Sequence, residues 1–227
     1  MTILTLFPLL FSMPAALTPA VPSPSNDALA VCEQLSAPGL APDVLAHAID
    51  AHTCAARRGE LAKSAHPERL VVIDYSLPST ATRLWVIDLD QRRVLDAQRV
   101  AHGQGTGDDL ASVFSNNDGS HQSSLGVFRT AETYIGEHGR SLRLDGLEPG
   151  FNDRARVRTI VLHGADYVSD TFVSQVGRLG RSWGCPAVSN DAVGPLIDEI
   201  AGGTLVVSWY PDATWLHQST FLHCDAL

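Results

Sequence analysis

The sequence is short of positive charge: its 16 lysines and arginines face 25 aspartates and glutamates, which gives a formal net charge of −9. Proteins that bind nucleic acid normally present a basic surface to the phosphates, so this composition gives no support to a nucleic-acid partner. The sequence also lacks internal repeats, coiled-coil heptads and clusters of cysteine or histidine with metal-ligand spacing. We therefore expect no metal and no cofactor.

Charged side chains are also absent between Met1 and Leu17, where residues 3–13 are mostly apolar. This apolar run is too short to span a bilayer as a helix, and small residues follow it, as in a secretory signal. We predict a signal peptide at residues 1–20, export to a secreted or periplasmic location, and no membrane span after cleavage. Since no lysine or arginine lies near Met1, a buried N-terminal strand or helix is the alternative.

Cysteine is scarce, with only Cys32, Cys54, Cys185 and Cys224 in the chain. Outside the cytoplasm, thiols tend to be paired, and four cysteines allow three complete pairings. A cysteine used as a nucleophile must stay reduced, which leaves one disulfide among the other three if Cys185 has that role. Cys32 and Cys54 flank a short helical segment, and we expect that pair.

Beyond residue 20 the chain changes from helical to strand character. Residues 21–67 read as a linker and a small N-terminal helical segment, with a helix that begins at Pro42 and ends near Gly59. Runs typical of strands follow at 70–75, 83–89, 94–101, 125–130, 142–144, 159–163 and 204–209. Short helices are predicted at 169–176 and 192–200, and a long loop rich in glycine and polar residues at 102–124. We predict a mainly β fold with short helices, like a β-sandwich or barrel, over residues 68–212, with a C-terminal tail at 213–227.

Two short patterns in this region carry possible chemistry. Cys185 lies in the turn Ser182-Trp183-Gly184-Cys185-Pro186, and His163 ends an apolar strand just before Gly164. A glycine before a nucleophile lets the backbone turn sharply, and backbone N–H groups in such a turn can face a developing oxyanion. A thiol needs a base to act as a nucleophile at neutral pH. Taken singly, each residue is more often structural than catalytic.

Together the two patterns resemble the signature of the YkuD-type murein L,D-transpeptidase catalytic domain. In that family a His-Gly pair ending a strand is followed by a Ser/Thr-X-Gly-Cys loop, as in His163-Gly164 and residues 182–185 here. Further blocks are similar in the same order, at 73–79, 101–103, 114–116, 123–126, 142–147, 152–153 and 163–168. The resemblance covers roughly residues 68–210.

The resemblance implies a role for each residue of the motif. Cys185 would be the nucleophile, His163 the general base and acid, Gly184 a backbone donor to the oxyanion, and Ser182 a support for the loop. A backbone carbonyl typically orients the histidine ring in this family, with Asp166 as a side-chain alternative. The implied substrate is a peptidoglycan stem peptide, cleaved with release of its terminal D-Ala. Attack by a second stem's amine on the thioester would give a 3–3 cross-link, whereas attack by water would make the enzyme an L,D-carboxypeptidase.

The sequence departs from the family pattern around the cysteine. Better-known members often have histidine at the position of Trp183 and an arginine at that of Ala187, and that arginine is taken to hold a substrate carboxylate. A guanidinium matches a carboxylate with two hydrogen bonds, so another arginine could replace it. Arg178, Arg181, Arg129 and Arg143 are the candidates for that role. The candidate substrate-binding residues are Trp183, Arg181, Arg178, Tyr134 and Gly126, with His102 as a further residue of the cleft wall.

Two other classes of protein are alternatives. A secreted, non-catalytic cell-wall-binding module would use the 102–124 loop for binding and would pair Cys185 with Cys224. A papain-like protease is disfavoured, because in that class the cysteine precedes the histidine and opens a helix.

Overall fold

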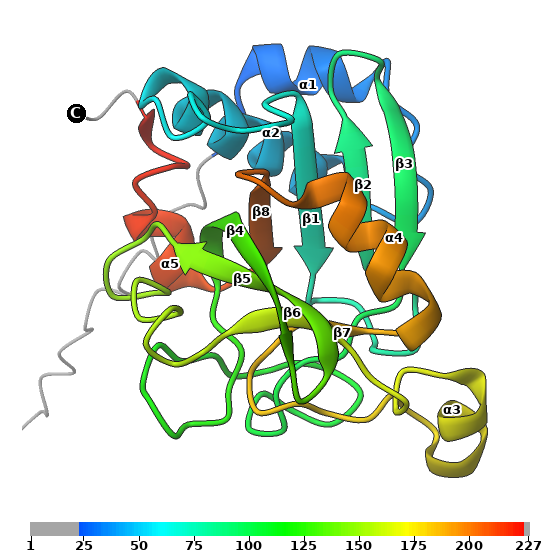
Figure 1. Cartoon of the computed structure of the whole chain (residues 1–227). Coiled ribbons are helices and arrows are strands. Elements are labelled where there is room, and N and C mark those ends of the chain that lie inside the picture. The colour runs from blue at the N-terminus through cyan, green and yellow to red at the C-terminus, as the bar shows by residue number, and fades with distance from the viewer. Residues whose placement is uncertain (1–22, 225–227) are drawn as a thin grey trace, which may run out of the picture.

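The computed structural model describes residues 23–224, which form one sheet covered on both faces by helices (Figure 1). The predicted signal peptide lies outside the described residues. No helix in the described part of the chain is long and apolar enough to cross a membrane. The mainly β architecture with short helices and an N-terminal helical segment is confirmed.

Eight strands form the sheet in the order β3-β2-β1-β8-β4-β5-β6-β7. Their bounds are β1 Arg69–Asp74, β2 Leu84–Asp88, β3 Arg93–Gln98, β4 Gly126–Gly136, β5 Gly139–Gly146, β6 Val161–Gly164, β7 Ala187–Val188 and β8 Leu205–Trp209. Neighbouring strands are antiparallel except for β1 with β8 and β6 with β7, which are parallel. The parallel pair β6–β7 brings two segments that are distant in sequence to the same edge of the sheet.

Both faces of the central strands are buried, so these strands read as continuous apolar runs. Leu70 and Val72 of β1 face the core shared with α1 (Asn26–Cys32), α2 (Pro42–Arg57) and α5 (Ala213–Gln218). Val71 and Ile73, which alternate with them, face the core shared with α4 (Asn190–Ile200). The helix α3 (Asp170–Val176) projects from the body of the molecule and has no buried residue (Figure 1).

The N-terminal helices are part of this core. Helix α2 begins at Pro42, whose missing N–H costs nothing in a first turn, and it buries nine residues. Helix α1 begins after Ser25, whose side chain accepts the Ala28 N–H. Two helices were not predicted: α1 begins within the residues read as linker, and α5 lies in the residues read as a tail. Both are short and owe their stability to packing on the sheet.

The expected Cys32–Cys54 disulfide is wrong. Cys54 pairs with Cys224 across 170 residues of sequence, while Cys32 and Cys185 are free. Cys54 lies on the buried side of α2, where the C-terminal segment packs, and Arg58 one turn further donates to the Thr220 carbonyl oxygen at 2.6 Å. Local spacing could not reveal the pairing, because it depends on the return of the C-terminus to α2. The Cys185–Cys224 pair expected of a binding module is likewise contradicted.

Candidate active site

Cys185 follows a sharp turn whose backbone geometry requires glycine at position 184. Gly184 has a φ of +121°, and a methyl group there would lie 2.8 Å from the Gln122 carbonyl oxygen. Any side chain would therefore collide with the 102–124 loop that packs against it. The Cys185 side chain is half-buried at the end of this turn.

The thiol of Cys185 sits between a donor and an acceptor of the chain that leads into β6. Its Sγ lies 3.5 Å from the Val161 N–H, which donates to it, and 3.7 Å from the Thr159 carbonyl oxygen, to which the thiol donates. Thr159 has a φ of +55°, which is strained for a β-branched residue. Burial raises the pKa of the Cys185 thiol, while the Val161 N–H and the charge of Arg158 oppose that effect. The burial effect is the larger one, so the thiol needs a base.

His163 lies on strand β6, which pairs with the β7 strand that follows Cys185. It is paired with Ala187 in the β6–β7 ladder, and its backbone N–H donates to the Pro186 carbonyl oxygen at 3.3 Å. The ring Nδ1 lies 2.9 Å from the Gly164 carbonyl oxygen and must be the protonated nitrogen there, because a carbonyl can only accept. The neutral ring therefore has Nε2 as its acceptor. Burial lowers the pKa of His163, with a contribution from His138, so the ring is neutral at neutral pH.

Ser182 bridges both ends of the cysteine turn. Its Oγ accepts the Gly184 N–H at 3.0 Å and donates to the Cys185 carbonyl oxygen at 2.6 Å. The Gly184 N–H is therefore engaged within the loop. Within residues 23–224, the backbone N–H groups of Trp183 and Cys185 have no hydrogen-bond partner. These two groups are the ones able to receive a developing negative charge.

Ser123 holds the other side of the same turn, and sequence reasoning did not single it out. Its Oγ donates to the Gly184 carbonyl oxygen at 3.0 Å and accepts the Gly103 N–H at the same distance. In a trans peptide the C=O and the following N–H point in opposite directions. Fixing the Gly184 carbonyl on Ser123 therefore turns the Cys185 N–H to the other side of the loop.

Trp183 is the exposed aromatic residue of the loop. Its side chain is 72% exposed, and its ring stacks on that of His121 with centroids 4.9 Å apart and an interplanar angle of 9°. The ring of His121 is held in turn by the Gln104 side chain at 2.9 Å. Together they form a flat wall on the loop that carries Cys185.

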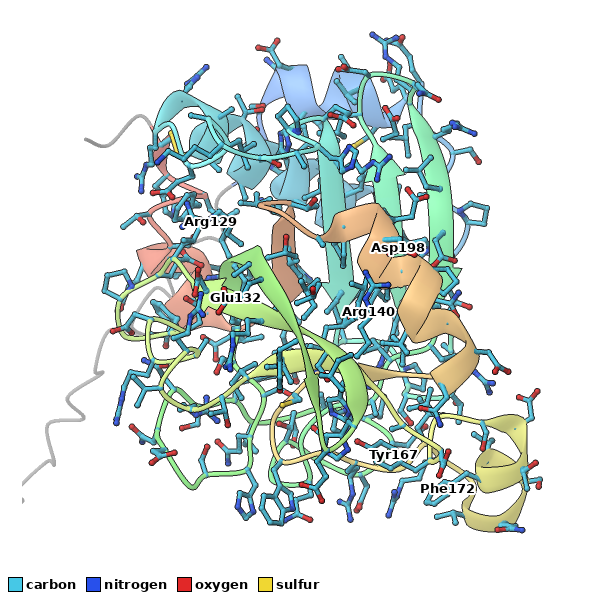
Figure 2. All side chains as sticks on the ribbon, viewed as in Figure 1. Arg129, Glu132, Arg140, Tyr167, Phe172 and Asp198 are labelled. Atoms are coloured by element: carbon cyan, nitrogen blue, oxygen red, sulfur yellow. A yellow bond between two sulfur atoms is a disulfide. The ribbon has the colours of Figure 1, made fainter. Side chains whose placement is uncertain are left out.

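The other predicted residues are dispersed. Arg181 and Arg178 both pair with Asp108, Arg129 pairs with Glu60, and Arg143 pairs with Glu132. Arg129 and Glu132 lie far from Tyr167 and Phe172, the side chains labelled near α3 (Figure 2). Arg143 also covers the Tyr134 ring at 4.5 Å, on the β4–β5 hairpin. These ion pairs give each of the four candidate arginines a carboxylate partner within the protein.

Three of the predicted residues serve the framework. Gly126 is buried, and a methyl group there would lie 2.3 Å from Glu148 Oε2, so the packing at this position requires glycine. His102 is buried beneath Arg83, which donates to its Nδ1 at 2.9 Å. Burial and the positive charge of Arg83 lower the pKa of His102 to about 4. The exposed Asp166 contacts Asn190 rather than His163.

A second histidine, also missed from the sequence, covers His163. His138 lies in the turn between β4 and β5, and its ring stacks on His163 with centroids 4.3 Å apart. No sequence signal links a hairpin turn to a strand end 25 residues later.

The fold and these residues describe a mixed-sheet domain that brings a free cysteine and a histidine together on adjacent segments. The family model for the L,D-transpeptidase catalytic domain, of the YkuD type, matches residues 36–209, well over half of the chain. The chain belongs to this family.

Several solved structures are similar to the chain. An L,D-transpeptidase from Mycobacterium smegmatis is 15% identical with a TM-score of 0.39, over 63% of this chain and 59% of that chain. An L,D-transpeptidase from Xylanimonas cellulosilytica is 18% identical with a TM-score of 0.36, over 87% of this chain and 100% of that chain. A Bdellovibrio bacteriovorus protein is 20% identical with a TM-score of 0.39, over 65% of this chain and 49% of that chain. The chain thus spans well under two thirds of the mycobacterial and Bdellovibrio proteins. A comparison with curated proteins finds no match.

Proposed function

We propose that the chain is an exported cysteine acyltransferase that forms 3–3 cross-links in peptidoglycan, with Cys185 as its nucleophile. The observation that carries the proposal is the free Cys185 thiol set against the strand of His163, in a family of L,D-transpeptidase catalytic domains. Of the four cysteines, Cys54 and Cys224 are paired, which fits an oxidising compartment outside the cytoplasm. Cys185 is one of two thiols that stay free, and it is the one that lies against the strand of His163.

The first step is acylation of Cys185. His163 Nε2 takes the thiol proton, and the sulfur attacks the carbonyl carbon of the stem peptide's L,D bond. The tetrahedral intermediate collapses with cleavage of the C–N bond, and the D-Ala amine leaves with the proton returned by His163. The product is a thioester between Cys185 and the shortened stem.

In this step the backbone N–H groups of Cys185 and Trp183 donate hydrogen bonds to the oxyanion. The Gly184 N–H named from the sequence is bonded to Ser182 Oγ, so in the proposal Gly184 serves instead to allow the turn, through its positive φ. Ser182 and Ser123 keep the turn rigid from its two sides. Donors held in place before reaction need no reorganisation as charge develops.

The second step is release of the acyl group. A side-chain amine of a second stem attacks the thioester carbonyl, His163 accepts the amine proton and passes it to the sulfur, and the C–S bond breaks to release the thiol and the new amide. Water in place of the amine would give the carboxypeptidase reaction. The flat wall of Trp183 and His121 is proposed to line the substrate cleft, with Arg181 and Arg178 at its margin.

Domain boundaries follow the same proposal. We assign residues 68–212 to the catalytic domain, with the N-terminal helical segment packed on it. Residues 213–224, the described part of the C-terminal tail, anchor that segment through the Cys54–Cys224 disulfide.

Muropeptide analysis tests the function. The purified protein incubated with disaccharide-tetrapeptides is expected to give 3–3 dimers and free D-Ala by mass spectrometry. Cys185→Ala and His163→Ala should each abolish both products, because each removes one partner of the proton transfer. Cys32→Ser, which removes the other free thiol, should keep full turnover.

Two results would count against the proposal. Full activity of a folded Cys185→Ala protein would exclude Cys185 as the nucleophile. Tripeptide with no dimer would instead assign the protein as an L,D-carboxypeptidase. A carbapenem should also acylate Cys185, read as one added drug mass that is absent from the Cys185→Ala protein.

A further inference from the structure

Arg158 differs from the arginines proposed from the sequence. Those four each have a carboxylate within 4.0 Å, whereas Arg158 has none among residues 23–224. Its side chain is nevertheless buried, with the residue 9% exposed. A buried cation normally needs a counter-charge, because removing it from water costs several kcal/mol. An uncompensated guanidinium in this position therefore calls for an explanation.

Neutral oxygens of the 102–124 loop surround the guanidinium. Its Nη1 donates to the Ser115 carbonyl oxygen at 2.7 Å and to Ser124 Oγ at 2.6 Å. Its Nη2 donates to the Gln122 carbonyl oxygen at 2.7 Å and to Ser120 Oγ at 3.2 Å. These oxygens satisfy the hydrogen-bonding capacity of both terminal nitrogens but do not neutralise the charge.

The charge lies directly beneath the cysteine turn. A methyl group placed on Gly184 would be 3.4 Å from Arg158 Nη2. The Gln122 carbonyl that accepts from Arg158 is the same one that packs on Gly184, and the adjacent Ser123 binds the Gly184 carbonyl. Arg158 also immediately precedes Thr159, whose carbonyl accepts from the Cys185 thiol. Arg158 is thus connected to the cysteine turn in two ways, through the loop residue Gln122 and through the adjacent Thr159.

We propose that Arg158 is a positioning residue of the Cys185 site: it folds the 115–124 loop beneath the turn and supplies an unneutralised positive charge that stabilises the anionic sulfur. The proposal rests on the proposed function, in which Cys185 must ionise. The charge cannot be lost at neutral pH, because a guanidinium keeps its proton. Burial alone disfavours the thiolate, and Arg158 offsets part of that effect.

The charges that act on Arg158 support this role. Burial lowers its pKa, and it is influenced by Asp118, by Cys185 and by Arg154. Asp118 and Arg154 are exposed, so solvent screens them more strongly. Cys185 is the only one of these three groups that is not exposed to solvent.

The test measures how fast iodoacetamide alkylates Cys185 as a function of pH. The protein carries Cys32→Ser, so that Cys185 is its single free thiol, and peptide mass spectrometry assigns the adduct. Arg158→Met keeps an unbranched apolar stem but removes the charge, and is expected to shift the profile to higher pH. The rate at pH 7.5 should fall about three- to tenfold. Arg158→Lys keeps the charge without the fork of donors, and should retain most of the profile even if the loop loosens.

Arg154→Met provides the matched control, because it removes an exposed charge from the same turn and should leave the profile in place. Thermal unfolding of each variant checks that it is folded. An unchanged profile in a folded Arg158→Met protein overturns the proposal, and so does an equal shift in Arg154→Met. If Arg158→Met does not fold, a shifted profile in a folded Arg158→Lys protein overturns it.

This readout is independent of muropeptide turnover. A shifted alkylation profile in a protein that is inert on muropeptides would support the role of Arg158 and contradict the proposed function.

Discussion

Opposing effects act on the Cys185 sulfur. Burial raises the pKa of the thiol, and the Thr159 carbonyl favours its protonated form by accepting its hydrogen. The Val161 N–H and Arg158 favour the thiolate. Because the burial effect is the largest, the pKa of the thiol is raised, and the proposed mechanism therefore relies on a neutral His163 to take its proton.

The stacked histidines give a prediction about acid pH. His138→Phe keeps an aromatic ring on His163 but cannot carry a charge, so the repulsion that helps to lower the pKa of His163 is removed. His163 should then protonate more readily as the pH falls. The acid limb of kcat/KM should therefore move to higher pH, because protonated His163 cannot accept the thiol proton.

An NMR titration of the His163 ring measures the same shift without a substrate. His66→Gln serves as control, since His66 pairs with Glu68 ahead of β1. A His163 titration identical in wild type and His138→Phe would contradict the electrostatic role of His138.

At the scale of elements, the cysteine turn and the 102–124 loop form one packed unit. A methyl group on Gly103 would lie 2.4 Å from the His121 carbonyl oxygen and 2.8 Å from Gly184 Cα. Both neighbours are backbone atoms and cannot rotate away. The close approach of the two segments therefore depends on glycine on both sides.

Gly103→Ala should consequently separate the two segments. We expect a loss of about 1–3 kcal/mol in the free energy of unfolding, from overpacking, and a slower reaction of Cys185 with iodoacetamide. Urea denaturation and alkylation rates measure the two effects. Gly194→Ala, in α4, should cost less, because the added methyl meets nothing within 4 Å beyond its chain neighbours, although the following Pro195 disfavours a helical backbone for a residue with a Cβ. Equal stability of the two variants would contradict the packing argument.

The elements also divide into those that the sequence could predict and those that it could not. The strand expected at 204–209 is β8, Leu205–Trp209, and the helix from Pro42 is α2, because each carries a long local pattern. The two-residue β7 has no such pattern and exists only through its pairing with β6 and the bridge between Ala187 and Ala101. In the candidate site, the Gly-Cys turn and the strand-ending histidine have local signals. His138, Ser123 and Arg158 reach the site through contacts between loops, which no local spacing encodes.

Across the whole molecule, the Cys54–Cys224 disulfide closes nearly the entire described chain into a loop. It joins α2 to the segment after α5, where Arg58 also lies over the Phe221 ring at 4.7 Å. The N-terminal helices and the C-terminus thus hold each other on the sheet face opposite α4. On the other face, Arg140 of β5 pairs with Asp198 of α4 at 2.7 Å, as Figure 2 also indicates.

Removing the disulfide should therefore lower the free energy of unfolding of the whole protein. The double variant Cys54→Ser, Cys224→Ser is expected to lose about 2–5 kcal/mol of unfolding free energy, because the unfolded chain gains freedom when so long a loop is opened. Urea denaturation with and without reductant provides the measurement. Cys32→Ser should change stability by less than about 0.5 kcal/mol. Wild-type protein whose midpoint is unmoved by reduction would refute this expectation.

The exposed Trp183, stacked on His121, also gives the protein an intrinsic fluorescence signal in the cysteine turn. The chain's other tryptophans, Trp85, Trp209 and Trp215, are buried, so Trp183 alone is open to a collisional quencher such as acrylamide. In the proposed cleft, a ligand that covers this wall would shield Trp183 from the quencher. Occupancy beside Cys185 can thus be followed by fluorescence in the unlabelled protein, before any bond is made or broken.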